Sequence, residues 1–393
     1  MHASLMSEAK TQDQAGSDSM SEFELQQYEI THKDKFDALI AHYTNLGVSD
    51  FMIGSRRAIK VKLHGHNAAV TTFSVTETQV SQIAEMIYGG KGLSAELFGK
   101  GLPCSYTFRY NHQKYRYRVN IVREYNGVFI VMRPIDSMPP KCSDLGIEKE
   151  IIQAYVKLLT SNNNEIKGTC LLFAGETGSG KSSSIAALNR YIFEESSLRQ
   201  QGLNFYTAES PIEYLYTEID EGNSVIAQLE VPKNVSTFPG AIYEFLRMAP
   251  DVIMVGETRD YETLDGMIKA SETGHVGITT IHANSVSQVV NRMLGMIPDH
   301  LRTQGEIKKV LSLLGIVVFQ KLLRRKAVDA SQKRGGRVAV REYLIFTEEV
   351  QNYLLDHMDD LTRATQYCVE TYGRSYQQHF NQLAERGVID VHH

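Results

Sequence analysis

The sequence has few cysteines, and they are poorly placed for a metal site or a disulfide framework. The four cysteines are Cys104, Cys142, Cys170 and Cys368. They stand far apart in the chain and form no CxxC pair, the spacing typical of zinc ligands and redox-active thiols. We therefore expect no structural zinc and no disulfides. This cysteine usage is typical of a reduced, cytosolic compartment.

The sequence also lacks a long apolar run and a strong excess of one charge. The longest apolar run, residues 311–319, is too short to cross a bilayer, and residues 1–25 lack the apolar core of a signal peptide. The formal net charge of −5 does not favour a nucleic-acid coat or a membrane-surface protein. If the protein works at a membrane, we expect a partner to bring it there.

The sequence contains enough apolar residues to form the cores of two domains. Its 393 residues are 42% apolar and 22% charged, which is ordinary for a globular protein. Pro134, Pro139 and Pro140 mark a linker, because proline disfavours both helices and central strands. The predicted parts are a polar, disordered segment over residues 1–25, an α+β domain over 26–135, the linker over 136–145, an α/β domain over 146–355 and a helical extension over 356–393.

The two domains differ in their predicted elements. The first should contain helices near residues 35–46 and 79–88 and a three-stranded antiparallel sheet over 105–109, 115–123 and 128–133. The second alternates helices with apolar strands, which predicts a doubly wound, mainly parallel sheet. Its predicted strands are residues 168–174, 204–208, 252–255, 276–281 and 316–320, followed by a hairpin around 338–347 and one or two helices in the last 40 residues.

A phosphate-binding loop stands at the start of the second domain. The pattern Gly175-x4-Gly180-Lys181-Ser182 follows an apolar strand and precedes a helix-like stretch, which is the setting that a P-loop requires. Glycines let successive backbone N–H groups converge on phosphate oxygens, and the helix adds its positive N-terminal end. We expect the lysine to reach the β- and γ-phosphates and the serine hydroxyl to join the shell of a Mg²⁺ ion. The predicted ATP-binding residues here are Gly175, Glu176, Thr177, Gly178, Ser179, Gly180, Lys181, Ser182 and Ser183.

Other polar side chains follow predicted strands of the same sheet. Glu257 ends one apolar strand, where a carboxylate could orient an attacking water. Glu209 and Glu213 flank Pro211 after another, and His282 follows a third. Ligands bind at the carboxyl ends of the strands in doubly wound folds, which favours a functional interpretation. The structural alternatives are that Glu257 merely ends a buried strand, that Glu209 and Glu213 are solvated acids of a loop, and that His282 is a structural histidine.

Four ordered motifs resemble those of the PilT-like type II/IV secretion ATPases. Residues 174–182, AESPIEY at 208–214, LRMAPDVIMVGETRD at 246–260 and ASETGHVGITTIHA at 270–283 are similar to the family's Walker A, Asp box, Walker B and His box. GVSDFMI at 47–53 and YRVNIVR at 117–123 resemble its PAS-like N-terminal domain, and GGRVAVREYLI at 335–345 its C-terminal hairpin. The resemblance covers residues 35–355, and within the family it is strongest to the DotB/TraJ branch of type IVB secretion and IncI-type conjugation.

The resemblance implies a fold, an activity and partners. The fold would be a PAS-like domain followed by a RecA-like P-loop domain. The protein would hydrolyse ATP as a homohexamer, with ATP between the two domains at a subunit boundary. It would work in the cytoplasm, peripheral to the bacterial inner membrane, on a secretion or conjugation apparatus that includes a larger secretion ATPase, without binding nucleic acid directly.

The resemblance also assigns roles to single residues. Lys181 and Ser182 would hold phosphate and Mg²⁺, and Glu257 would act as general base and reach the metal through water. Glu209 would assist at the metal–water shell, and His282 would sense the γ-phosphate. Three arginines of the first domain are candidates to reach phosphate, because a guanidinium suits developing charge, although a solvated strand face would also explain them. They are Arg118, Arg123 and Arg133.

Two departures from the family keep alternatives open. Ser210 stands where the Asp box usually carries an aspartate, so one carboxylate is missing. Residues 349–354 differ from the AIRNLI-type segment associated with pilus retraction, and residues 357–393 have no counterpart that we can interpret. The alternatives are a type IV pilus retraction motor, a nucleic-acid motor that uses the basic loop over residues 324–337, and a nucleotide switch that does not hydrolyse ATP.

Overall fold

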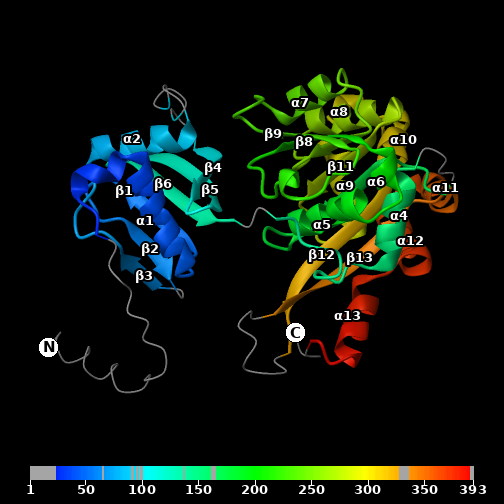
Figure 1. Cartoon of the computed structure of the whole chain (residues 1–393). Helices are drawn as coiled ribbons and strands as arrows, with labels where there is room; N and C mark the ends of the chain where they lie inside the picture. Colours follow the sequence, from blue (N-terminus) through cyan, green and yellow to red (C-terminus); the bar gives the residue numbers. More distant parts are fainter. Residues whose placement is uncertain are drawn as a thin grey trace. The chain divides into compact units, whose positions relative to one another are not determined.

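The chain folds into two compact units, residues Met1–Ile135 and Asp136–His393 (Figure 1). The computed structural model describes residues 24–389 except 64–65, 90–92, 94–96, 98–100, 136–137, 161–164 and 327–335. Almost all of the segment predicted to be disordered therefore lies outside the described residues, as do part of the predicted linker and most of the basic loop. No helix in the described part of the chain is long and apolar enough to span a membrane.

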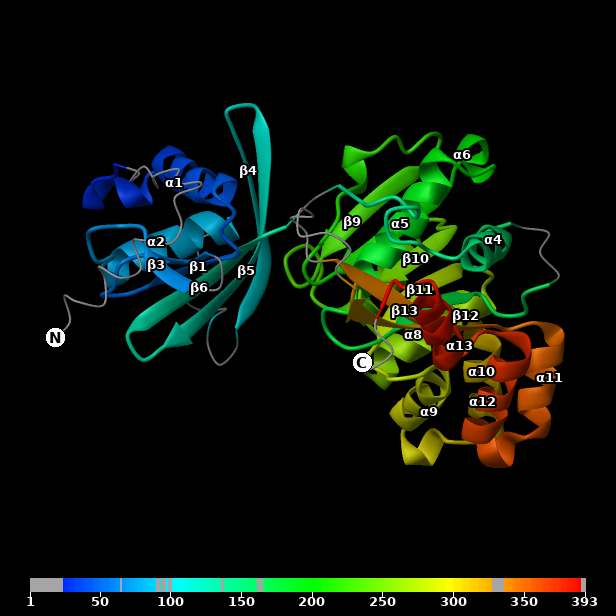
Figure 2. The same ribbon diagram turned by 90° about the horizontal axis from the view of Figure 1, so that it is seen from below.

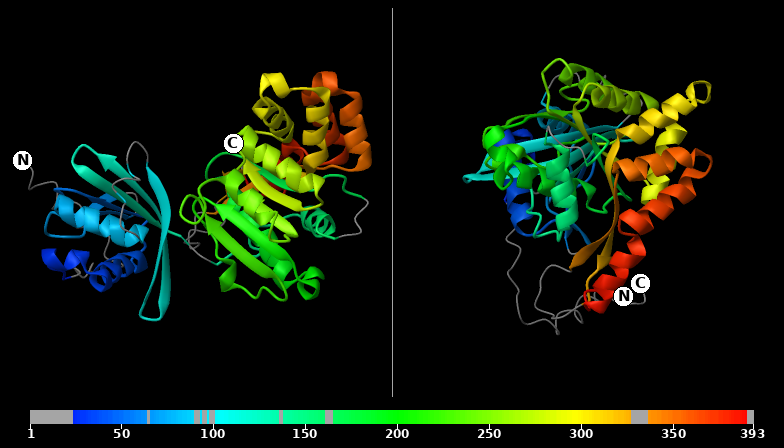
Figure 3. Two further views of the ribbon diagram at one scale, coloured as in Figure 1. Left: turned by 90° about the horizontal axis from the view of Figure 1, so that it is seen from above. Right: turned by 90° about the vertical axis from the view of Figure 1, so that its right-hand side faces the viewer.

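The first unit is a six-stranded sheet in the order β3-β2-β1-β6-β5-β4. All five strand pairs are antiparallel, and α1 and α2 lie against one face, where their apolar side chains share a core with the strands (Figures 2 and 3). The elements are η1 Gln27–Thr31, α1 Lys33–Asn45, β1 Asp50–Gly54, β2 Lys60–Leu63, β3 His66–Ala69, α2 Glu77–Tyr88, β4 Leu102–Tyr110, β5 Gln113–Glu124 and β6 Gly127–Pro134.

The second unit is a seven-stranded sheet in the order β13-β12-β7-β11-β10-β8-β9. Every pair is parallel except β12 with β13, which form the predicted hairpin. The strands are β7 Cys170–Ala174, β8 Asn204–Glu209, β9 Val225–Glu230, β10 Val252–Val255, β11 Val276–Ile281, β12 Leu314–Arg324 and β13 Arg337–Ile345. This antiparallel sheet followed by a mainly parallel one confirms the predicted fold class.

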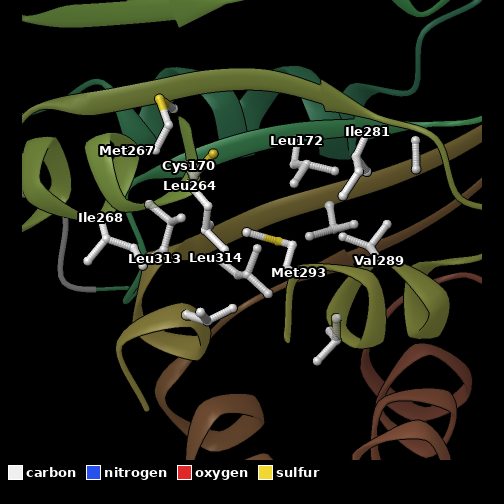
Figure 4. Close-up of a cluster of buried hydrophobic side chains, with 14 of the residues drawn as sticks. Cys170, Leu172, Leu264, Met267, Ile268, Ile281, Val289, Met293, Leu313 and Leu314 are labelled. Atoms are coloured by element: carbon white, nitrogen blue, oxygen red, sulfur yellow. The ribbon is translucent and has the colours of Figure 1, made fainter. Parts of the chain in front are cut away.

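Helices cover both faces of the second sheet, because the strands are apolar on both sides. One face carries α4 Lys149–Leu158, α5 Lys181–Glu194 and α6 Leu198–Gln201. The other face carries α7 to α12, and Figure 4 shows part of that core, where Cys170 and Leu172 of β7 meet Leu264 and Met293. The remaining elements are η2 Tyr216–Glu218, α7 Phe238–Phe245, α8 Tyr261–Glu272, α9 Val286–Met296, η3 Asp299–Leu301, α10 Gln304–Leu313, α11 Glu348–Asp356, η4 Met358–Asp360, α12 Leu361–Tyr372 and α13 Tyr376–Glu385.

The helical extension packs on the second unit. Leu361, Ala364, Cys368 and Val369 of α12 join the core beside α9. Helix α13 packs against β13, where Leu383 contacts Val340. All four cysteines are buried and none forms a disulfide bond. Burial raises the pKa of Cys142 and Cys170 to about 12 and that of Cys368 to about 11.

Candidate nucleotide site

The phosphate-binding loop connects β7 to α5 in the predicted strand–loop–helix arrangement. Strand β7 is entirely buried, and the loop turns at Gly175, Gly178 and Gly180, which have φ angles of +147°, +80° and +85°. Only glycine takes such angles readily, because a Cβ would clash with the backbone. Gly180 then caps α5, whose first residue is Lys181. The loop thus presents backbone N–H groups and a helix N-terminus, the two features that bind phosphate.

The Lys181 side chain lies over the loop. Its ammonium donates to the carbonyl oxygens of Gly175 and Glu176 at 2.7 and 2.9 Å. Burial lowers the pKa of Lys181, and the carboxylates of Glu257 and Glu213 act on it in the opposite direction. The carboxylates of two acids that follow different strands thus both favour the charged form of this lysine.

Glu257 follows β10 and is held at both carboxylate oxygens. Arg259 Nη2 lies 2.6 Å from Oε2, and Nε2 of His282, which follows β11, lies 3.3 Å from Oε1. Backbone hydrogen bonds fix the flanking residues: the Gly256 N–H donates to Ala208, and the Thr258 N–H to Thr280. The carboxylate is thus oriented rather than free to rotate. Glu257 and His282 both belong to the polar side chains predicted at strand ends, whereas Arg259 follows Glu257 without a local signal for this contact.

Glu209 ends β8 and is buried. Its Oε1 accepts hydrogen bonds from Thr207 Oγ1 at 2.8 Å and from Gln228 Nε2 at 3.3 Å. Gln228 belongs to β9, the parallel neighbour of β8. Strand β9 was not among the predicted strands, because a half-exposed edge strand that contains glutamine lacks the apolar run that marks the others.

The segment after β8 reaches the first turn of α5. Ser183 Oγ lies 2.7 Å from the hydroxyl of Tyr214, in a contact where either oxygen can donate. Ser182 is half-buried in the same turn of α5, next to Lys181. The structure therefore brings together the predicted loop, Glu209, Glu213, Glu257 and His282 at the carboxyl ends of the strands.

The order of the strands in the sheet is not predictable from the sequence. Strand β11 lies between β10, which precedes Glu257, and the P-loop strand β7. Hydrogen-bond pairing between strands is set by the tertiary fold and leaves no local signal. The intervening strand is the one that carries His282, and this places the histidine between the loop and Glu257.

The three predicted arginines lie on the first unit and do not form a single cluster. Arg118 of β5 and Arg133 of β6 are register partners, and both are exposed. Arg133 also pairs with Asp50, at 2.7 Å. Arg123 pairs in register with Val128 near the other end of β5 and is exposed there. A role in nucleotide binding stays a prediction for all three.

Comparison with known proteins identifies the family. Residues 101–391 match the family described as "Type II/IV secretion system protein". The chain belongs to this family of secretion ATPases. The match continues to residue 391, so most of the extension over residues 357–393 does have a counterpart in the family, contrary to the expectation from the sequence, and its helix α12 joins the core of the second unit.

Individual relatives of this secretion ATPase include pilus and secretion proteins. The type IV pilus ATPase PilU of Pseudomonas aeruginosa is 30% identical over 315 residues, which cover 80% of this chain and 75% of PilU. The X-ray structure of the Legionella pneumophila ATPase DotB has a TM-score of 0.80 at 31% identity, covering 91% of this chain and 93% of DotB. The pilus retraction motor PilT with bound ADP has a TM-score of 0.73 at 25% identity, covering 94% and 95%.

The secretion ATPase is thus a P-loop enzyme that binds nucleotide and hydrolyses ATP, which confirms the predicted activity. The predicted Mg²⁺ fits the donor chemistry of the site. Mg²⁺ prefers oxygen ligands and usually takes only one or two from the protein, the rest coming from phosphate and water. The Ser182 hydroxyl beside Lys181 could supply one such oxygen, and the oriented carboxylate of Glu257 could hold a metal-bound water.

Proposed function

We propose that the protein is the ATP-hydrolysing subunit of a homohexameric motor for a type IVB secretion or conjugative transfer machine. The observation that carries the proposal is the place of the Glu257–His282 pair: His282 lies 3.3 Å from the oriented carboxylate of Glu257 and lines a pocket together with Gly175 and Glu176 of the phosphate-binding loop. The motor would work at the cytoplasmic face of the inner membrane, docked through partners.

Each residue of the site has a role in this mechanism. The loop amides, the N-terminus of α5 and Lys181 bind the phosphates and stabilise the charge that develops on them during transfer. Glu257 orients the attacking water and accepts its proton. His282, in contact with Glu257, senses the γ-phosphate. Glu209, fixed by Thr207 and Gln228, would help to hold the water ligands of a bound Mg²⁺.

Mechanical work requires that ATP and ADP stabilise different conformations. A ligand shifts a conformational equilibrium only by its difference in affinity for the two states. The γ-phosphate is the difference between the two nucleotides, and His282 and Glu257 are the groups placed to detect it. We therefore expect both residues to couple hydrolysis to movement as well as to chemistry.

The choice of machine rests on the likeness to DotB. Legionella DotB has a higher TM-score with this chain than PilT does, 0.80 against 0.73. The departure of residues 349–354 from the retraction-associated segment supports the same choice. The similarity to PilU supports a pilus retraction motor as the second candidate. Deletion of the gene separates the two: loss of secretion or conjugation with normal twitching supports the first, and loss of twitching alone supports the second.

The first experiment is to measure ATPase activity and mass. Lys181→Ala should weaken nucleotide binding about ten- to a hundredfold, because it removes a charge-assisted contact to phosphate. Full ATPase activity in this variant would overturn the proposed site. Light scattering should give a mass near six times 44.2 kDa with ATP and Mg²⁺, retained longest by Glu257→Gln. A monomer under every condition would overturn the ring.

A further inference from the structure

Gln320 is a buried amide in a strand that is otherwise apolar where it faces the core. It lies on β12, directly beside the P-loop strand β7, and is 1% exposed. Burying an amide whose hydrogen bonds to water are not replaced costs on the order of 2–7 kcal/mol. A glutamine at this position therefore calls for partners, and the structure provides them on the phosphate-binding loop.

Both ends of the Gln320 amide are engaged. Nε2 donates to the carbonyl oxygen of Ser179 in the loop at 2.6 Å. Oε1 accepts from Ser184 Oγ in the first turns of α5 at 2.8 Å and from Arg341 Nε of β13 at 2.7 Å. One side chain thus joins the loop, the helix behind it and the hairpin strand.

The loop also packs closely on Gln320. A Cβ added to Gly175 would lie 2.4 Å from the Gln320 carbonyl oxygen, and one added to Gly180 would lie 2.9 Å from Nε2. At Gly175 the contact is with the backbone of Gln320, so this close approach requires glycine there, and at Gly180 the contact with the hydrogen-bonded amide favours it. The contact fixes the distance between the loop and β12.

The contact to Ser179 determines which way the next peptide group points. In a trans peptide the C=O and the following N–H point in opposite directions. Holding the Ser179 carbonyl toward β12 turns the Gly180 N–H away from β12, toward the side on which the loop amides converge. If this peptide rotated, a carbonyl oxygen would face the phosphates and repel them.

Arg341 fixes the orientation of the amide. A guanidinium can only donate, so Oε1 of Gln320 must face Arg341 and Nε2 must face the loop. Arg341 is itself 1% exposed and is anchored by the carbonyl oxygens of Gly146 and Leu145 at 2.9 and 3.1 Å and by Glu148 at 3.2 Å. These contacts therefore exclude the conformer in which the amide oxygen and nitrogen of Gln320 are exchanged.

We infer that Gln320 is a positioning residue for nucleotide binding: it holds the Ser179–Gly180 peptide in the orientation that binds phosphate, and Arg341 fixes its amide. The inference rests on the proposed nucleotide site. Gln320 acts through the loop backbone and does not touch the nucleotide itself.

The test is a set of near-isosteric substitutions at Gln320. Gln320→Glu keeps acceptors for Ser184 and Arg341 but has no amide donor for Ser179. Gln320→Met keeps the length without introducing a charge. We expect each to raise the KM for ATP and the Kd for ADP about tenfold, the effect of one lost hydrogen bond to the loop. Gln351→Glu is the matched control, because Gln351 Nε2 donates to the Leu311 carbonyl on a distant part of the same unit.

The outcomes separate positioning from general destabilisation. A merely structural role would lower the melting temperature and the fraction of active enzyme, and hence the apparent kcat, without changing KM. Wild-type KM and Kd in a folded Gln320→Glu or Gln320→Met variant would overturn the inference. If Lys181→Ala loses nucleotide binding while both Gln320 variants keep it, only this inference fails. If Lys181→Ala also binds normally, the proposed site itself is wrong.

Discussion

His282 Nε2 lies 3.3 Å from Oε1 of Glu257, although the two residues follow different strands and are 25 positions apart in the chain. Arg259 holds the other oxygen of the same carboxylate. This arrangement fixes the direction of the carboxylate lone pairs and leaves His282 placed to link it to a bound phosphate.

Replacing Glu257 with Gln should lower kcat for ATP hydrolysis roughly a thousandfold, because loss of a general base typically costs between 10² and 10⁴. ATP binding should stay within about threefold of wild type, since the phosphate-binding loop is intact. Steady-state ATPase assays with a separate binding measurement check both statements. Glu262→Gln, an exposed acid on the neighbouring helix α8, is the control and should behave as wild type. More than a tenth of wild-type turnover in Glu257→Gln would remove the general-base role.

Replacing His282 with Ala should lower kcat about tenfold and reduce the preference for ATP over ADP. The reason is that the variant loses both the contact to Glu257 and the group placed near the γ-phosphate. The Kd for ADP should change less than about twofold, because ADP has no γ-phosphate. Titrations with both nucleotides measure this difference, with the exposed His300→Ala as control. An equal loss of ATP and ADP affinity would contradict a sensing role.

Two glycines of the loop should respond differently to alanine. A Cβ on Gly178 meets no atom within 4 Å, so Gly178→Ala should cost only the strain of a positive φ, about 1–2 kcal/mol. Gly175→Ala adds a clash with the Gln320 carbonyl at 2.4 Å and should destabilise more and abolish nucleotide binding. Thermal unfolding and binding of a fluorescent ADP measure the contrast. Similar losses in both variants would mean that close packing on β12 is not the cause.

Acid should destabilise the second unit partly through His379. Burial, assisted by the Arg374 guanidinium, lowers the pKa of this imidazole from 6.5 to about 4. The unfolded chain therefore takes up a proton below pH 6.5 while the folded chain does not. The contribution to stability is complete above pH 6.5 and is lost as the pH falls toward 4, by about 3 kcal/mol.

The variant His379→Asn isolates this contribution. In wild type, the Arg341 backbone N–H donates a hydrogen bond to His379 Nδ1 at 2.9 Å. The asparagine side-chain oxygen can still accept this hydrogen bond, but the asparagine side chain does not titrate. Denaturant unfolding between pH 4 and 7 should show a shallower loss of stability in the variant than in wild type. His357→Asn, at an exposed position, should keep the wild-type slope. Parallel pH profiles for His379→Asn and wild type would show that this histidine is not buried in its neutral form.

The sequence predicts those parts of the fold and site that have a local signature. The strands before the P-loop and before Glu257 are recognisable as short apolar runs, and the strand before His282 as a run rich in β-branched residues. The P-loop itself has a fixed spacing of glycines and lysine. In these places local composition and tertiary burial agree.

The remaining features depend on contacts between distant positions. Gln320 appears in the sequence as the polar end of an apolar strand, yet β12 continues to Arg324 and the amide is buried on the loop. Arg341 resembles an outward-facing charge in an alternating strand, but it is one of the least exposed side chains of the chain. The available signal was a polar residue at the end of a predicted apolar strand. Its partners, Ser179 and Glu148, could not be identified without the structure.

The rate at which the buried cysteines are alkylated should report on local unfolding of the surrounding core. Thiols react as thiolates, and burial both raises the pKa of Cys142, Cys170 and Cys368 and excludes reagents from them. Alkylation must therefore wait until the surrounding core opens. Cys104 reports on the first unit, Cys142 on the face beneath α5, and Cys170 with Cys368 on the opposite face. The order in which these four sites acquire label would record which layer loosens first during a catalytic cycle.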